Sequence, residues 1–341
     1  MKMKKIRKIF VSQLKGRIKL DKKNILIIHT GGTISMSEDA LEKVVKPTEV
    51  NPLVEKTKEL ENFANLIVEE PFHLPSPHIT AHEMYEIREI ILKHLEHIDG
   101  VVITHGTDTL EETAYFLDLT LKPIIPIVVT GAMRSSNEIG SDGLYNFISA
   151  IRVALSEEAK DKGVLVVLND EIHTAVNVTK TSTSNLNTFQ SPQYGPIGIV
   201  TKRSILFHHA PTIHEHYELN SISKRAVILK AFAGMDSTLL DAILNSNFDG
   251  VIIEALGQGN LPPKTIPGIK NLIAANIPVV LVSRCFNGIA EHVYSYEGGG
   301  AHLKELGVIF AHGLNGQKAR LKLLVLLENN FSKEEIEKLF D

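Results

Sequence analysis

The sequence predicts an α/β fold with a larger N-terminal domain built on a parallel sheet and a smaller C-terminal α/β domain. The 341 residues exceed one typical domain of about 100–200 residues. Short β-rich apolar runs alternate with stretches of helical periodicity, which is typical of βαβ units. One irregular stretch, 209–224, interrupts the alternation, which resumes after it. We therefore expect two α/β domains joined by a linker.

The chain begins with a basic segment, residues 1–23, in which ten lysines and arginines are opposed by a single aspartate. Its apolar run Ile9-Phe10-Val11 is too short for the core of a signal peptide. Contact with RNA or anionic lipid is one interpretation of such charge. We expect a solvated arm that binds neither nucleic acid nor membrane.

The N-terminal domain is expected to span 24–208. Its predicted strands are 25–29, 101–104, 125–130 and 164–168, and its predicted helices are 81–98, 111–121 and 141–156. The linker, 209–224, belongs to a histidine-rich stretch, but the spacing matches no tetrahedral metal site and we assign no metal.

The C-terminal domain, 225–341, repeats the alternation on a smaller scale. Its predicted strands are 227–232, 250–255 and 278–283, and its predicted helices are 236–246, 268–275 and 316–329.

Composition restricts the class of protein. Hydrophobic residues make up 43% of the chain and charged residues 22%, which is ordinary for a globular protein. No apolar stretch approaches the roughly 20 residues of a membrane-spanning helix. Cys285 is the single cysteine, which rules out an internal disulfide and favours a reducing compartment. We expect a cytoplasmic protein.

Two threonines occupy matching positions after predicted strands. Thr33 follows Ile27-Ile28-His29-Thr30-Gly31-Gly32, and Thr107 follows Ile103-Thr104-His105-Gly106. The carboxyl ends of parallel strands form the edge where open α/β sheets bind ligands. Each segment alone also fits an ordinary strand-ending turn. Together they predict one shared pocket that contains two hydroxyl groups.

A threonine hydroxyl needs a base to act as a nucleophile. Thr107, Asp108 and Lys180 can form a triad, provided that the lysine is neutral, which desolvation promotes and a nearby carboxylate opposes. The alternative for Lys180 is a surface lysine in a polar loop. Gly32, Gly106 and the segment around Ala132 allow main-chain groups to approach and stabilise an oxyanion.

The threonine motifs resemble those of the bacterial-type L-asparaginase family, and the similarity extends from about 24 to 341. Further matching motifs are Thr130-Gly131-Ala132-Met133-Arg134, Ser141-Asp142-Gly143, Val178-Thr179-Lys180-Thr181, Gly257-Gln258-Gly259-Asn260-Leu261 and Gln317-Lys318-Ala319-Arg320.

The resemblance implies hydrolysis of L-asparagine to L-aspartate and ammonia through a threonine acyl-enzyme, with neither metal nor organic cofactor. Thr33 would carry the acyl group, and Thr107, Asp108 and Lys180 would form the second catalytic group. Substrate binding would involve Gly32, Ser76, Pro77, Thr107, Asp108, Ala132 and Asn260, with Ser76 and Asp108 holding the α-carboxylate and α-amino groups. A homodimer or homotetramer is implied, in which Asn260 completes a neighbour's pocket.

Several positions depart from the pattern common in the family. Residues 34–50, the expected lid, contain no tyrosine, and Pro77-His78 follows Ser76, as in the cytoplasmic type I subgroup. Cys285 also fits that subgroup, whose members can bind an effector asparagine beside this cysteine. Glu254 stands where an arginine would bind the effector carboxylate. We therefore expect no allosteric site and a hyperbolic rate curve.

Two other functions stay open. An ammonia-supplying subunit of a tRNA-dependent amidotransferase shares these motifs, but it normally carries a whole additional N-terminal domain, and only about 23 basic residues precede the first predicted strand. A non-catalytic amino-acid sensor would be expected to lack Thr33, Thr107 or Lys180, and all three are present. L-glutamine would be a weaker second substrate. The sequence does not predict how strongly L-asparagine is preferred, because the one methylene by which the two differ changes the binding free energy by only about 1–3 kcal/mol.

Overall fold

The N-terminal part of the protein is built on an eight-stranded sheet. The computed structural model describes residues 22–38, 45–47, 53, 64–122, 124–211 and 214–341. The strand order is β12-β11-β8-β7-β6-β5-β1-β4. These strands are β1 (Asn24–His29), β4 (Asn65–Glu69), β5 (Gly100–Thr104), β6 (Ile127–Thr130), β7 (Val164–Leu168), β8 (Glu171–Thr174), β11 (Gly198–Val200) and β12 (Ile205–Phe207). Strands from β4 to β7 are parallel, and β8, β11 and β12 add antiparallel pairs at one edge.

Alternating side chains of β1 enter different cores, because successive residues of a strand point to opposite faces. Leu26 and Ile28 lie in the core beneath α3 (Ala81–His94) and α4 (Leu110–Thr120). Ile25 and Ile27 lie in the core beneath α5 (Gly143–Ala154). Both faces of the parallel part are therefore covered, as the continuous apolar runs of β5 and β7 require.

The C-terminal domain contains a smaller, wholly parallel sheet in the order β13-β14-β15-β16. Its strands are β13 (Ala226–Lys230), β14 (Gly250–Ala255), β15 (Val279–Ser283) and β16 (Ile309–Phe310). Helices α6 (Thr238–Leu244) and α7 (Ile266–Ala274) cover one face, and α9 (Gly316–Glu328) covers the other. Helices α8 (Gly300–Glu305) and α10 (Lys333–Phe340) complete the domain. The predicted fold class is confirmed.

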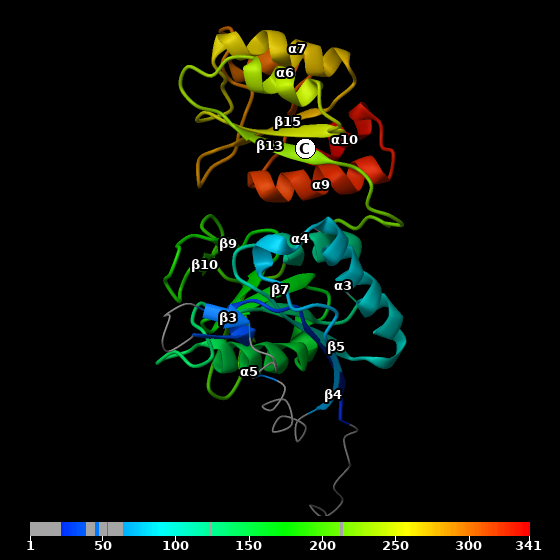
Figure 1. Cartoon of the computed structure of the whole chain (residues 1–341), viewed down its shortest axis with the longest axis vertical. Helices are drawn as coiled ribbons and strands as arrows, with labels where there is room; N and C mark the ends of the chain where they lie inside the picture. The colour runs from blue at the N-terminus through cyan, green and yellow to red at the C-terminus, as the bar shows by residue number, and fades with distance from the viewer. Residues whose placement is uncertain (1–21, 39–44, 48–52, 54–63, 123, 212–213) are drawn as a thin grey trace, which may run out of the picture.

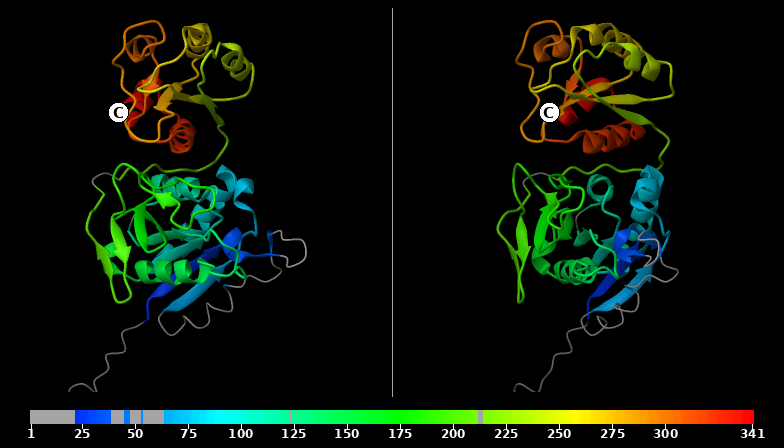
Figure 2. Two further views of the ribbon diagram at one scale, coloured as in Figure 1. Left: turned by 90° about the vertical axis from the view of Figure 1, so that its left-hand side faces the viewer. Right: turned by 60° about the vertical axis from the view of Figure 1, so that its left-hand side comes forward.

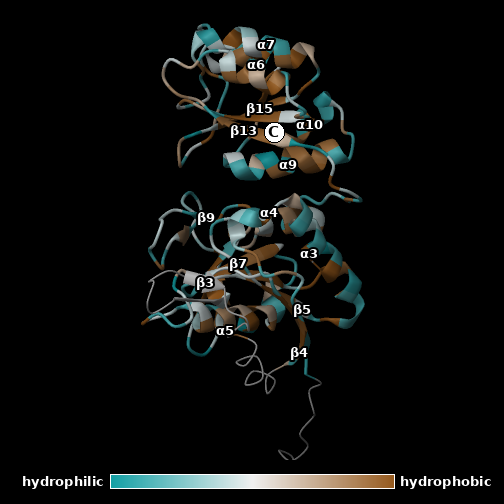
Figure 3. Ribbon diagram, viewed as in Figure 1, coloured by the Kyte–Doolittle hydropathy of each residue, from teal (hydrophilic) through white to brown (hydrophobic). Residues whose placement is uncertain are grey.

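The two domains meet through helices. α4 packs against α9, and one core cluster runs from the N-terminal sheet through both helices to the C-terminal sheet. The two sheets are stacked along the long axis of the molecule, with α9 lying between them (Figures 1 and 2). The strands of both sheets are predominantly apolar, whereas the outward sides of the helices carry polar residues (Figure 3). The domain interface brings together buried polar groups of both domains, such as Lys318 and Glu111.

Several predicted elements differ from the observed ones in length or were missed. The α-helix predicted at 81–98 ends at His94 and continues as the 3₁₀ turn Leu95–His97. The antiparallel edge strands were not predicted, because they contain only three or four residues each. The basic arm lies outside the described residues except for Lys22 and Lys23. Of the predicted lid, 34–50, the structure describes 34–38 and 45–47, which include the antiparallel pair β2 (Met36–Glu38) and β3 (Val45–Pro47). Among the helices that the structure describes, none is long and apolar enough to cross a membrane.

Candidate active site

The candidate site forms where β1 and β5 end side by side. The loops after these strands touch at two glycines: a Cβ atom on Gly32 would lie 2.2 Å from the Cα atom of Gly106. Gly32 has a φ of +81°, and Gly31 before it has a φ of +103°, a region that side chains disfavour. The pair of Gly-rich turns thus brings the segments of Thr33 and Thr107 together, as the sequence predicted.

Thr33 begins a short 3₁₀ turn, Thr33–Ser35, directly after Gly32. Thr33 is half-buried, whereas Ile34 is buried in the core beneath α5. The Ser35 hydroxyl donates to the carbonyl of Gly32 at 2.9 Å, which closes the turn. Thr33 is therefore held at the carboxyl ends of β1 and β5 by the turn at Gly32 before it and the buried Ile34 after it.

Thr107, Asp108 and Lys180 form a compact polar cluster. The Lys180 Nζ atom donates to the Thr107 Oγ1 atom at 3.0 Å and lies 2.6 Å from the Asp108 Oδ1 atom. Thr107 is buried, Lys180 has a side chain that is 16% exposed, and the Asp108 side chain is 61% exposed. The largely buried Nζ atom therefore touches a buried hydroxyl, while the carboxylate beside it opens to solvent. A neutral amine at this position can take the Thr107 proton, and the protonated amine can return it.

Lys180 reaches this cluster from a two-residue strand. Strand β9 (Thr179–Lys180) pairs antiparallel with β10 (Phe189–Gln190), so that Lys180 stands opposite Phe189. The alternative interpretation had Lys180 in a polar loop, and the structure shows this short β pair instead. The interpretation of Lys180 as a free surface lysine is wrong, because its ammonium contacts Thr107 and Asp108.

Ser76 connects the next loop to the same cluster. It starts the 3₁₀ turn Ser76–His78, is buried, and accepts a hydrogen bond on Oγ from the Asp108 backbone N–H at 3.2 Å. The Thr109 hydroxyl donates to the Ser76 carbonyl at 2.8 Å. Pro77, by contrast, is exposed. The loop is thus fixed to the start of α4 from two directions.

Ala132 lies fully buried in the loop after β6. The carboxylate of Asp142 accepts the backbone N–H groups of Met133 at 3.1 Å and Arg134 at 3.0 Å. The Asn146 side chain donates to the Gly131 carbonyl at 3.0 Å. Asp142 and Asn146 therefore hold the loop around Ala132 in one conformation. This loop lies beside the Thr33 segment, because a Cβ atom added at Gly143 would meet both Ala132 Cβ, at 3.3 Å, and Ile34 Cγ1, at 3.1 Å.

Two buried histidines, His29 and His105, lie at the ends of β1 and β5. Burial, reinforced for His29 by the nearby His73, lowers the pKa of His29 to about 4, and burial lowers the pKa of His105 to about 4. His29 Nδ1 lies 2.8 Å from Thr104 Oγ1, and His105 Nε2 lies 2.9 Å from Thr113 Oγ1. Both rings are neutral at physiological pH and act as hydrogen-bonding parts of the core.

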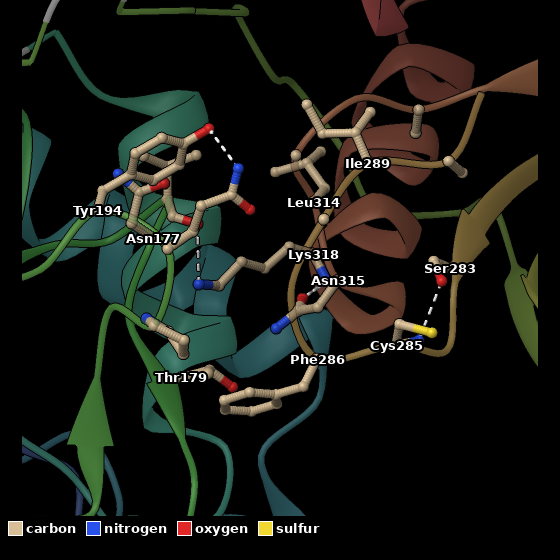
Figure 4. A pocket seen from close by; sticks show the side chains of 17 residues that line it. Asn177, Thr179, Tyr194, Ser283, Cys285, Phe286, Ile289, Leu314, Asn315 and Lys318 are labelled. Atoms are coloured by element: carbon tan, nitrogen blue, oxygen red, sulfur yellow. Dashed lines mark hydrogen bonds between the residues drawn. The ribbon is translucent and has the colours of Figure 1, made fainter. Parts of the chain in front are cut away.

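Three further residues, to which the sequence analysis gave no role, lie beside the site. Glu111, Asn315 and Lys318 form hydrogen bonds or an ion pair with one another and with the segment that carries Lys180. Asn315 and Lys318 line a small cavity of about 80 Å³ between the domains (Figure 4). The one signal in the sequence was the Gln317-Lys318-Ala319-Arg320 motif, which does not show that Lys318 lies near Lys180 in the fold. Their role could be found only from the packing of α9 on α4.

Asn260 lies apart from the cluster within one chain. Its Oδ1 atom accepts the Gly300 backbone N–H at 3.3 Å, inside the C-terminal domain. No hydrogen bond joins it to Thr107, Asp108 or Lys180 within the described ranges. The structure thus brings together the predicted residues of the N-terminal domain and leaves Asn260 outside.

Two other residues of the C-terminal domain, Glu254 and Cys285, are those on which the prediction of no effector site was based. The Glu254 carboxylate pairs with Lys230 at 3.3 Å, and Cys285 is exposed. Cys285 also lines the cavity of Figure 4. Across the part of the chain that is described, no cluster of three or more histidine, cysteine, aspartate or glutamate side chains is placed to hold a metal ion.

Comparisons with known proteins match both domains. The model of the asparaginase N-terminal domain matches residues 24–213, and that of the glutaminase/asparaginase C-terminal domain matches residues 225–340. A probable L-asparaginase of Deinococcus radiodurans is 39% identical over 322 residues, 93% of this chain and 96% of that protein. L-asparaginase 2 of Escherichia coli is 31% identical over 93% of this chain and 92% of that protein. A crystal structure of a probable cytoplasmic L-asparaginase from Campylobacter jejuni superposes with a TM-score of 0.83 at 31% identity, covering 94% of this chain and 99% of that one. The chain belongs to the asparaginase family.

Proposed function

We propose that the protein is an L-asparaginase that hydrolyses L-asparagine to L-aspartate and ammonia. The observation that carries the proposal is the contact of Lys180 Nζ with Thr107 Oγ1 at 3.0 Å and with Asp108 Oδ1 at 2.6 Å, beside the Thr33 turn. Relatives named L-asparaginase at 31–39% identity over most of the chain support the same activity.

In the proposed reaction, the Thr33 hydroxyl attacks the side-chain amide carbon, and the resulting oxyanion is stabilised by main-chain N–H groups of the strand-end loops. The C–N bond then breaks and ammonia leaves after protonation. Water attacks the aspartyl ester, releases L-aspartate and restores Thr33. Thr107, Asp108 and Lys180 transfer the protons, and the reaction uses neither metal nor organic cofactor.

Substrate binding is proposed at the same edge of the sheet. Ser76 and Asp108 would hold the α-carboxylate and the α-amino group, and the hydrogen bond of the Asp108 N–H to Ser76 Oγ fixes their spacing. Gly32, Pro77, Thr107 and Ala132 would line the pocket. Asn260 would complete the pocket of a neighbouring copy in a homodimer or homotetramer, because it lies outside its own chain's cluster.

Secondary activity and location are also proposals. Weak hydrolysis of L-glutamine is proposed, since a relative from Pseudomonas aeruginosa is named glutaminase-asparaginase. A cytoplasmic location is proposed from the single free cysteine and from the cytoplasmic relative of known structure.

The test is ammonia release by the purified chain, without tRNA or a partner protein, from L-asparagine and L-glutamine over a concentration series. Faster turnover of asparagine with a hyperbolic curve is expected. Release that depends on tRNA and a partner enzyme would instead identify an amidotransferase subunit, and binding without turnover would identify a sensor. A steep sigmoidal curve would contradict the predicted absence of an effector site.

A further inference from the structure

Lys318 is a buried lysine that reaches from one domain into the other. It lies in the first turn of α9, and its side chain is 1% exposed. Its Nζ atom donates to the carbonyls of Val176, at 3.0 Å, and Val178, and lies 3.8 Å from Glu111 Oε2. In Figure 4 the side chain extends from α9 towards the segment that carries Asn177 and Thr179. Two carbonyl acceptors within hydrogen-bond distance and one carboxylate at ion-pair distance thus surround the ammonium group.

The protonated form of Lys318 predominates at neutral pH. Burial lowers the pKa of Lys318 to about 8, while the carboxylates of Glu111 and Asp118 oppose that shift. The charged ammonium can therefore bind two carbonyls of segment 176–178, which lies just before Lys180 in the chain.

Glu111 connects the same lysine to the backbone of Lys180. Its Oε1 atom accepts the Thr179 hydroxyl at 3.0 Å and the Lys180 backbone N–H at 3.3 Å. Its Oε2 atom accepts the Asn315 side-chain N–H at 3.1 Å. One buried carboxylate of α4 therefore binds both the strand that carries Lys180 and the start of α9.

The side-chain amide of Asn315 forms hydrogen bonds through both its oxygen and its nitrogen atom. Its Oδ1 atom accepts the Lys318 backbone N–H at 3.1 Å, which caps α9, and its Nδ2 atom donates to Glu111. The beginning of α9 is thereby fixed to α4 and to segment 176–180 at once.

We infer that Lys318, Asn315 and Glu111 are positioning residues that hold Lys180 against Thr107, so that the C-terminal domain sets the geometry of a catalytic group in the N-terminal domain. Strand β9 contains only two residues, and an isolated two-stranded pair is marginally stable in water. A displacement of about 1 Å can cost about 10²-fold in rate. The inference rests on the proposed function, since it takes Lys180 as catalytic.

The experiment compares two variants with a matched control in the full-length protein. Lys318→Met removes the ammonium but keeps the length of the side chain. Asn315→Ser keeps a good helix cap and removes the hydrogen bond to Glu111. Arg320→Met is the control, because Arg320 Nη2 pairs with Glu112 at 3.1 Å across the same interface and, among the interactions of the described residues, forms no hydrogen bond or ion pair with segment 176–180.

Two readouts are measured for each variant: kcat and KM for asparagine, and the rate of competitive acetylation of Lys180, followed by peptide mass spectrometry. For Lys318→Met we expect kcat to fall by about 10–100-fold with KM changed less than about threefold, and faster acetylation of Lys180. Asn315→Ser should change both readouts in the same direction but less. Arg320→Met should leave both within about twofold of the wild type.

Equal losses of kcat in Lys318→Met and Arg320→Met would overturn the inference, as would unchanged acetylation of Lys180. If Lys318→Met does not fold, Asn315→Ser decides between the same outcomes. If the wild type releases no ammonia from asparagine, the proposed function fails, whereas the acetylation rates still test whether α9 holds Lys180.

Discussion

Lys180 is the residue on which the chemistry of the site depends. Its Nζ atom contacts the hydroxyl of Thr107 and the carboxylate of Asp108, while its own backbone N–H is bound by Glu111. Asp108 is mostly exposed, so the ion pair contributes little to folding. Its value lies in the orientation of the ammonium group towards Thr107.

Replacement of this lysine should therefore separate activity from stability. We expect Lys180→Met to lower kcat for asparagine by about 10²–10⁴-fold, the usual contribution of a proton-transferring side chain, with little change in the melting temperature. Steady-state ammonia release and thermal denaturation measure the two effects. Lys270→Met, at an exposed position of α7, is the control. Equal activity of both variants would remove Lys180 from its proposed role.

At the residue scale, the sequence predicted most of the cluster. Thr107, Asp108, Lys180 and Ser76 are brought together as expected, because motifs at strand ends converge at the same edge of a parallel sheet. Glu111 was not predicted, since its importance comes from hydrogen bonds to residues 68 and 204 positions away in the sequence.

At the scale of elements, the close contact of the loops after β1 and β5 decides where the two threonines stand. Gly32→Ala would add a Cβ atom 2.2 Å from Gly106 Cα at a φ of +81°. We expect loss of asparagine hydrolysis and a fall of more than about 2 kcal/mol in the free energy of unfolding. Both quantities are measured, the second by urea denaturation.

The control for this glycine separates crowding from backbone strain. Gly195 has a φ of +73°, and a Cβ atom added there would have no neighbour within 4 Å among the described residues. Gly195→Ala should therefore cost only about 1 kcal/mol. A Gly32→Ala variant as stable as Gly195→Ala would contradict the close contact of the loops.

Helix α4 also carries a largely buried carboxyl group, that of Asp118, which links folding to pH. Burial raises the pKa of Asp118 from 3.8 to about 7, although the Val164 N–H, which it accepts at 2.6 Å, and Lys318 oppose the shift. Because the pKa is higher in the folded state than in the unfolded state, the stabilisation is complete below about pH 4 and is lost as the pH rises towards 7.

Asp118→Asn should remove this pH dependence, because an amide does not titrate. The stability of the wild type relative to the variant should fall by on the order of 4 kcal/mol between pH 4 and pH 8. Urea denaturation at several pH values measures the difference. Glu334→Gln, an exposed position of α10, should follow the wild-type curve. Parallel curves for Asp118→Asn and the wild type would show that the carboxyl group is not perturbed.

The prediction of elements succeeded where hydrophobic periodicity was long. Helices α4, α5 and α9 lie within one or two residues of their predicted limits. Strands β4, β8, β11 and β12 were missed, because a strand of three to five residues is too short to show a clear alternation in the sequence. The antiparallel edge of the first sheet therefore could not be predicted from periodicity.

At the scale of the whole molecule, the position of Asn260 predicts an active site that two subunits share. Thr33→Val and Asn260→Ala should each be inactive or nearly so. Co-expression of both chains should restore about a quarter of the wild-type rate if dimers with two-fold symmetry mix statistically, because one site of each hybrid dimer is intact. Ammonia release from the mixed preparation measures this. A mixture no more active than the two variants alone would show that Asn260 does not serve a neighbour.

The stacking of the two domains was not predictable from sequence patterns, which describe each domain separately. The continuous core through α4 and α9 includes the fully buried side chains Phe116 and Leu321. Polar contacts across this interface, such as those of Asn315 with Glu111 and of Lys318 with the Val178 carbonyl, follow from packing geometry alone.

The central claim is that Thr33 carries the acyl group during asparagine hydrolysis. The most direct measurement is acid quenching of the enzyme during turnover, followed by tryptic digestion and mass spectrometry, since Thr33 and Thr107 fall in different tryptic peptides. An aspartyl ester on residues 24–43, absent in Thr33→Val, is the expected result. An ester on the peptide that contains Thr107 would contradict it.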